Sequence, residues 1–389
     1  MSPQGDFSVE SKLLRTSDGG DHLPEACGRS GSTMARRKSP LLSVAVRVNI
    51  ALVLLLWTYN AHSAGFLRGE FFLGNGVSAE HGLLLRDSVG LEGFGKLSGE
   101  RGDWATVALQ VRLTRYRYLD MDNRIFVRNE WEPEFHTTYI NFKGLFGRLN
   151  FKAGHLEVPF GLEPVIDTHS VLVPSTAMVN LGTMQDWGAS LNGQLRWFDY
   201  EVALTSGAGM MANFNPFERE RGRYLVSGRI QPVSSGNTQI GIAALIGEMS
   251  PIEHSNLDQM NDGGDEHTEE PETEALRSER RIGLDLRTPV FFLNSAFDTR
   301  LEVALGTRDG KSVVSFDGAV AREFGSSWRG VVGVRLWRHA DETPDVWGLL
   351  SLRKQLTSLL AWEAMLSQDF STEGVRKDTS LLTLIYFTR

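Results

Sequence analysis

The sequence predicts an all-β fold: a transmembrane antiparallel β-barrel of about sixteen strands. Three observations predict it. From residue 65 onward, segments of roughly ten residues alternate apolar and polar side chains, as the strands of a membrane barrel do. Short and long links alternate between these segments. Tryptophans gather near the ends of the segments. A soluble all-β protein is the alternative, but such a fold has no reason to sort its links by length.

The stretch "WGASLNGQLRW" shows the alternation most clearly. Trp187, Ala189 and Leu191 fall on one face of a strand, whereas Ser190 and Asn192 fall on the other. The pattern recurs in "RRIGLDLRTPVFF" and "WRGVVGVRLW". The predicted strands start near Phe66, Ser88, Asp103, Glu134, Gly147, Asp186, Asp199, Arg221, Asn237, Glu279, Ala296, Lys311, Ser327, Asp345, Ser358 and Asp378.

The links predict how the barrel is oriented. Short links such as "SGERGD", "KGLFG" and "WFD" follow even-numbered segments. Most odd-numbered segments precede longer links, among them 120–133, 158–185, 207–220 and 249–278, although "TRDG" is a short exception. Outer-membrane barrels have short periplasmic turns and long extracellular loops, so we expect the long links to be extracellular.

The first 64 residues predict export. "MARRKSPLLSVAVRVNIALVLLLWTYNAHSAG" begins at residue 34 with a basic stretch, continues with an apolar core and ends with small residues, the order of a signal peptide. A membrane anchor is the alternative, but the apolar run is short for one. We therefore expect residues 1–33 to be a non-structural upstream extension, 34–64 the signal peptide and 65–389 an outer-membrane barrel. The only cysteine, Cys27, lies in the extension, so the barrel has no disulfide.

Composition and motifs restrict the function. The net charge of −8 argues against nucleic acid as a partner. No zinc-protease motif and no phosphate-binding glycine loop occurs, so no cofactor is predicted. The segment 252–279 is strongly acidic. We expect it to be a solvated extracellular loop; a divalent-cation site assisted by His254 and His267 is the alternative.

The stretch "GHLEVPFGLE" predicts a strand end followed by an unusually long loop. Pro159 lacks an amide hydrogen and ends the strand, and Gly161 allows the chain to turn. Because the lumen of so wide a barrel otherwise fills with water, we expect the loop to fold inward and narrow it. A loop folded outward over the rim is the alternative. The predicted constriction residues are Pro159, Phe160, Gly161, Glu163, Asp167 and His169.

The same region resembles the phosphate-selective porins of Gram-negative outer membranes. The matching residues are Gly154, Pro159, Phe160, Gly161, Leu162 and Glu163, then Gly188, Leu191 and Gly193, over about sixty residues. The resemblance implies a sixteen-stranded, usually trimeric, passive channel. Phosphate selectivity in that family depends on basic constriction residues, but residues 159–185 contain no Lys or Arg. Many such barrels also end in an aromatic residue that the barrel-assembly machinery reads, whereas this chain ends in Thr388 and Arg389.

Alternation also predicts which charges face the lumen. The pore-lining basic candidates are Lys152, Arg196, Arg223, Arg229, Arg287 and Arg335. Arginine outnumbers the acids on these faces modestly, which favours a weak preference for anions. The alternative is that the charges pair across strands and only keep the wall polar.

The sequence thus predicts a porin for small hydrophilic or anionic solutes, embedded in outer-membrane lipids. One alternative is a barrel enzyme of lipase type, suggested by Asp167, His169 and Ser170. Another is a receptor or adhesin that acts through its long loops.

Overall fold

The structure is a computed structural model that describes residues 65–78, 82–100, 102–119, 125–162, 164, 172, 184–208, 223–233, 237–249, 276–292, 295–340, 343–370 and 379–388. All of them belong to one compact unit, Leu41–Arg389. The expected extension and signal peptide lie outside the described residues. No helix in the described ranges is long and apolar enough to cross a membrane.

The described chain is almost entirely β-structure. The strands are β1 (Gly65–Ser78), β2 (Gly82–Gly99), β3 (Gly102–Leu119), β4 (Ile125–Gly144), β5 (Leu149–Glu157), β6 (Gln185–Gln194), β7 (Phe198–Thr205), β8 (Tyr224–Pro232), β9 (Gln239–Met249), β10 (Arg277–Phe292), β11 (Ser295–Arg308), β12 (Lys311–Phe324), β13 (Trp328–His339), β14 (Asp345–Gln355), β15 (Leu360–Asp369) and β16 (Thr379–Thr388), with one short 3₁₀ turn, η1 (Leu145–Gly147).

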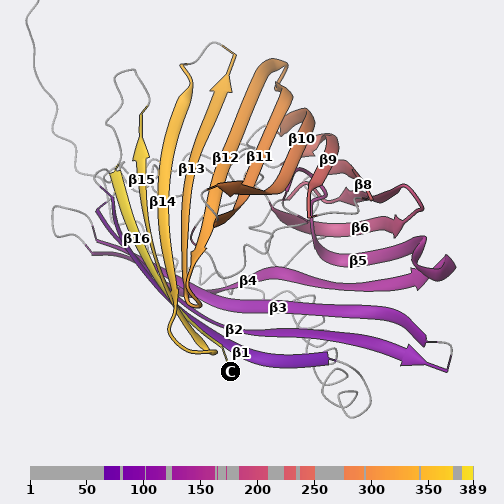
Figure 1. The fold of residues 1–389 in the computed structure, drawn as a ribbon, viewed down its shortest axis with the longest axis horizontal. Helices are drawn as coiled ribbons and strands as arrows, with labels where there is room; N and C mark the ends of the chain where they lie inside the picture. Colours follow the sequence, from indigo (N-terminus) through magenta and orange to yellow (C-terminus); the bar gives the residue numbers. More distant parts are fainter. Residues whose placement is uncertain are drawn as a thin grey trace, which may run out of the picture. The chain divides into compact units, whose positions relative to one another are not determined.

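The strands form a closed antiparallel barrel in chain order. Each strand pairs with its neighbours in sequence, and β1 closes the ring against β16 from Glu70↔Thr388 to Ser78↔Ser380. Figure 1 shows these first and last strands side by side. Closure leaves no unpaired sheet edge. The predicted sixteen-stranded antiparallel barrel is confirmed.

The two faces of the barrel differ in polarity. On β9, Ile240, Ile242 and Ile246 are 46–57% exposed, whereas Ala243 and Leu245 between them are at most 4% exposed. Across the barrel, the exposed face is apolar, and the covered face carries most of the charged side chains. The covered face is the inner wall, because closing the sheet brings that face around the lumen.

Several predicted boundaries are wrong. β2 begins at Gly82 rather than Ser88, and β4 begins at Ile125 rather than Glu134, so the link expected over 120–133 is much shorter. The β3–β4 register also shifts near Leu109 and again near Thr114. These irregularities interrupt the two-residue period, which explains why alternation did not reveal the start of β4.

Candidate functional site

Two conformational constraints lie at the end of β5 and at the start of the link that follows it. Gly154 has φ +138°, and a Cβ there would lie 2.2 Å from the carbonyl oxygen of Thr138 on β4, so only glycine fits. Beyond the strand, the N–H of Phe160 donates to the carbonyl oxygen of Val158 at 2.7 Å. This hydrogen bond closes a three-residue turn centred on Pro159, whose ring restricts φ to a value that such a turn accepts.

The turn places the next residues against β11. Gly161 has φ +62°, and a Cβ there would lie 2.3 Å from the carboxylate of Glu302. The N–H of Leu162 donates a hydrogen bond of 2.9 Å to that carboxylate. Glu302 is 2% exposed, so the contact is shielded from water. Glycine at 161 is therefore required by both backbone conformation and space.

Phe160 anchors this segment in an apolar cluster. Its side chain is 1% exposed. The ring also lies above Gly283 on β10, where a Cβ would approach to 3.0 Å. The cluster consists of Val158, Phe160, Leu225, Ala243, Leu245, Met249 and Ala304, which come from the loop, β8, β9 and β11. The start of the loop therefore packs on the inner wall several strands away from β5.

A later residue of the same loop contacts the opposite wall. Leu172 is partly buried and packs against Phe72, Leu384 and Tyr386 on β1 and β16. β1 and β9 lie eight positions apart in either direction around the ring of sixteen. The loop returns to its starting point, where the N–H of Val158 donates to the carbonyl oxygen of Met184 at 2.9 Å. The segment between these ends therefore contacts two opposite sides of the lumen.

The predicted constriction residues can be located only in part. Pro159, Phe160 and Gly161 are buried in the segment that packs on β8–β11. Glu163, Asp167 and His169 lie outside the described residues, as does Ser170 of the enzyme alternative. Their role in narrowing a pore stays a prediction.

Many inner-wall charges are paired between strands that are adjacent or two apart in the ring. Five pairs join one base to one acid: Arg68–Glu92 at 2.6 Å, Arg86–Glu134 at 2.9 Å, Arg112–Glu70 at 3.0 Å, Lys152–Glu201 at 2.8 Å and Arg353–Glu363 at 3.5 Å. Pairing lowers the cost of placing these charges away from bulk water. On these strands the wall has the one-to-one arrangement that was the alternative to a net basic lining.

The wall of β10–β13 departs from one-to-one pairing. At its long-loop end, where the long links leave the barrel, Glu279 is fully buried between three arginines. They lie 3.1 Å (Arg277), 2.9 Å (Arg281) and 2.5 Å (Arg308) from its carboxylate. Two of the guanidinium groups, those of Arg281 and Arg308, lie 5.0 and 4.7 Å from the ring of Trp337. Both Nη atoms of Arg281 are buried and have no hydrogen-bond partner among the described residues.

The middle of this wall is acidic. Asp285, Glu302 and Asp317 are direct partners across β10, β11 and β12. Arg229 makes a two-pronged contact with Asp285 at 3.0 and 2.6 Å, and Arg335 pairs with Asp317 at 2.5 Å. Arginines thus flank the row at both ends, while the central carboxylate holds the loop through the Leu162 N–H.

A second group of arginines lies nearer the short-turn end. Asp298 accepts hydrogen bonds from Arg287 at 3.0 Å and from Arg300 at 2.9 Å, and Arg329 lies 3.7 Å away. This group again sets three arginines against one carboxylate. The β10–β13 wall is therefore basic, acidic and basic in succession along the barrel axis.

Five of the six predicted basic residues lie on or beside the inner face. Lys152, Arg229, Arg287 and Arg335 occupy the pairs and groups described above. Arg223 is half-buried immediately before β8. Arg196 is the exception, because it lies exposed in the β6–β7 turn with its guanidinium 4.7 Å from the ring of Trp197. A residue in a turn has no fixed face, so strand alternation does not apply to it.

Sequence reasoning missed the centre of the first arginine group. It assigned 252–279 to an acidic loop, but β10 begins at Arg277, so Arg277 and Glu279 belong to the wall. Arg308 was also missed, although it continues the alternation of Arg300 and Glu302 along β11. The rest of the acidic segment lies outside the described residues. Within the described ranges, no group of three or more potential metal ligands was found.

Comparisons with known proteins agree with this architecture. No family model matches the chain, and no curated protein matches it. Among solved structures, an anion-selective porin from Comamonas acidovorans matches with a TM-score of 0.54 and 11% identity, covering 84% of this chain and all of that one. Pseudomonas putida OprB at high pH matches with a TM-score of 0.58 and 9% identity, covering 86% of this chain and 96% of that one.

A third match is a loop-deletion mutant of OmpT, an outer-membrane protein of Vibrio cholerae. Its TM-score is 0.56 at 8% identity, and the match covers 84% of this chain and 99% of the other. At such low identities the similarity shows the fold alone. The chain therefore has the barrel fold of these outer-membrane proteins over nearly their whole length.

Proposed function

We propose that this chain is an outer-membrane channel that allows small hydrophilic solutes to diffuse passively. The observation that carries the proposal is the loop after β5, which packs on β8–β11 through Phe160 and on β1 and β16 through Leu172. A barrel with an apolar outer face, a charged inner face and a loop across its lumen is suited to selective diffusion. No bound cofactor is needed for this mechanism.

The solute preference that we propose is weakly anionic. It rests on the two groups around Glu279 and Asp298, each of which sets three arginines against one carboxylate. Arginine-rich rings in a pore favour anions. The one-to-one charge pairs on the other strands and the acidic row of Asp285, Glu302 and Asp317 limit this preference for anions. We do not extend the resemblance to phosphate-selective porins to a preference for phosphate, because residues 159–185 contain no Lys or Arg.

The proposal includes the setting of the channel. Residues 34–64 act as a cleaved signal peptide, the barrel-assembly machinery inserts residues 65–389, and three copies associate in the outer membrane. A trimer form of Vibrio cholerae OmpT matches with a TM-score of 0.50 at 8% identity, which supports testing a trimer here. Cross-linking of the detergent-extracted protein measures the number of copies.

The deciding experiment is a planar-bilayer recording. The full chain is expressed with its own leader in a Gram-negative host, extracted from the outer membrane and added under a salt gradient. We expect stepwise conductance and a reversal potential whose sign indicates anion preference. A silent bilayer contradicts the channel, provided that the shift in gel mobility on heating shows the barrel to be folded. A reversal potential of cationic sign contradicts only the anion preference.

A further inference from the structure

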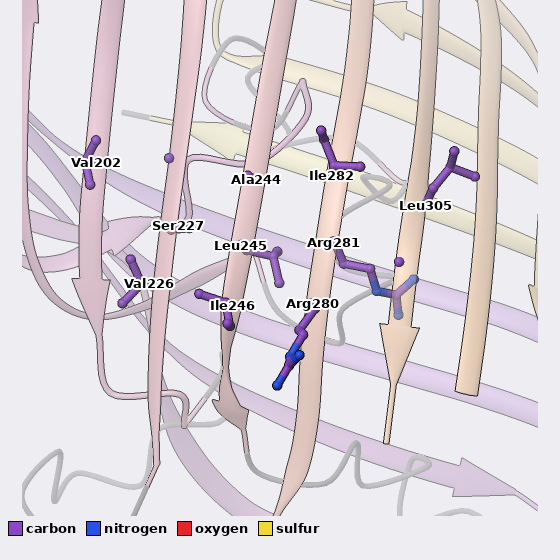
Figure 2. Close-up of a pocket in the computed structure, with 12 residues that line it drawn as sticks. Val202, Val226, Ser227, Ala244, Leu245, Ile246, Arg280, Arg281, Ile282 and Leu305 are labelled. Carbon is purple, nitrogen blue, oxygen red and sulfur yellow. The ribbon is translucent and has the colours of Figure 1, made fainter. Parts of the chain in front are cut away.

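A hollow on the outer face of β7–β11 has no role in the lumen. Its volume is about 530 Å³, and its lining is formed mainly by outward side chains. Val202, Gly228, Ala244, Ile282 and Leu305 are successive partners across the five strands. Because Gly228 and Ala244 are the smallest residues of this row, the face is recessed there between the branched side chains of Val202 and Ile282. Figure 2 shows Val202 and Leu305 at the two sides of the hollow.

One charged side chain reaches this hollow from the outer face. Arg280 is exposed and lies beside Ile246 on β9, one row closer to the long-loop end than Ile282. Figure 2 shows its side chain extending from β10 toward that end. Among the described residues, no side chain pairs with its guanidinium. Glu248, which lies beside Ser278 in the next row, does not form an ion pair with it.

We propose that this hollow binds a phosphorylated lipid with several acyl chains, as found in the outer leaflet of an outer membrane. One acyl chain occupies the recess at Gly228 and Ala244, and the Arg280 guanidinium holds a phosphate of the head group. The inference rests on the proposed outer-membrane location. A cation near the rim with no ion-pair partner among the described residues, and an apolar recess toward the middle of the barrel, match an amphiphile, which has one anionic end and one apolar end.

The height of Arg280 agrees with this assignment. It is the fourth residue of β10, so it lies about 10 Å from the end of the strand at ~3.3 Å per residue. The apolar band of a membrane barrel is about 25 Å tall and is flanked by interfacial girdles. Arg280 therefore lies near the interface, where a lipid phosphate neutralises a charge that the acyl region disfavours.

Two variants separate the head-group contact from the acyl-chain contact. Arg280→Gln removes the charge. Gly228→Leu fills the recess, and the fold accommodates it because a Cβ at 228 makes only ordinary contacts, 3.4 Å or more from Glu201 and Val202. Arg338→Gln, an exposed outer-face arginine on β13, and Val332→Leu, at an exposed site on the same strand, are the matched controls.

The test measures binding of lipid A to the folded, detergent-extracted full chain by titration with a fluorescent lipid A. We expect Arg280→Gln to weaken binding about fivefold and to have no effect with dephosphorylated lipid A. Gly228→Leu weakens binding of both lipids, and the two controls leave binding unchanged. Equal binding by wild type and both variants overturns the proposal. A change in the number of copies on Gly228→Leu, with lipid binding unaltered, also overturns it and assigns the face to a second copy.

The bilayer recording distinguishes failure of this inference from failure of the proposed function. If the barrel conducts but the wild type and both variants bind lipid A equally, the proposed channel function stands and the lipid site is rejected. A silent barrel that binds lipid A through Arg280 rejects the channel and keeps the lipid site.

Discussion

The carboxylate of Glu302 on β11 holds the backbone N–H of Leu162 at 2.9 Å, although the two residues are 140 positions apart in the chain. The contact ties the loop after β5 to the far wall of the barrel. Glu302 lies between Asp285 and Asp317 on the neighbouring strands, so this carboxylate faces like charges on both sides and also accepts the hydrogen bond from the loop. We therefore expect this acceptor to contribute to the position of the loop.

Replacing Glu302 by alanine should free the start of the loop. The N–H of Leu162 loses its acceptor, and the space next to Gly161 opens. We expect a larger single-channel conductance with more open-channel noise. Glu302→Gln keeps a carbonyl oxygen and should stay close to wild type. If alanine and glutamine variants both conduct as wild type does, the contact does not position the loop.

Truncating Phe160 tests the apolar anchor separately. Phe160→Ala removes a ring that is 1% exposed, and such changes cost about 3–5 kcal/mol of stability. We expect a lower urea midpoint for the gel-mobility shift and a higher conductance. Phe151→Ala is the control, because Phe151 lies on the outer face at 46% exposure. Equal conductance in the two variants would show that the ring does not narrow the lumen.

Asp285→Asn should destabilise the barrel through Arg229. Arg229 is 7% exposed, and its guanidinium is held by both carboxylate oxygens of Asp285. Removing one partner of a buried pair typically costs about 3–5 kcal/mol, because the other charge stays uncompensated. Urea unfolding measures the loss. The double variant Arg229→Met with Asp285→Leu should recover most of it. A double variant as unstable as Asp285→Asn would refute this explanation.

The two arginine groups should set the sign of ion selectivity. Arg281→Gln removes a charge whose Nη atoms have no hydrogen-bond partner in the described part of the chain, and Arg300→Gln removes a charge from the group around Asp298. Each should move the reversal potential under a salt gradient toward cation selectivity, and the double variant should move it further. Arg338→Gln on the outer face is the control. No shift in the double variant would show that these groups do not contact the ion path.

The strands could be predicted from the sequence because alternation is local. Trp187, Ala189 and Leu191 share a face through backbone geometry alone, whatever their distant partners. The same rule found Arg229, Arg287 and Arg335 on the inner wall. It failed at the start of β4, where register shifts interrupt the period, and at Arg196, which lies in a turn.

The sequence by itself determined the number of strands, their faces and the position of the long loop at Pro159 and Gly161, since each depends on a few neighbouring residues. Only the tertiary structure decided what these residues meet: that Glu302 holds Leu162, that Phe160 and Leu172 reach opposite walls, and that Glu279 gathers three arginines. The first two contacts join segments far apart in the chain, whereas the Glu279 group joins the adjacent strands β10 and β11. The contacts on opposite walls form only once the sheet has closed into a ring through β1 and β16.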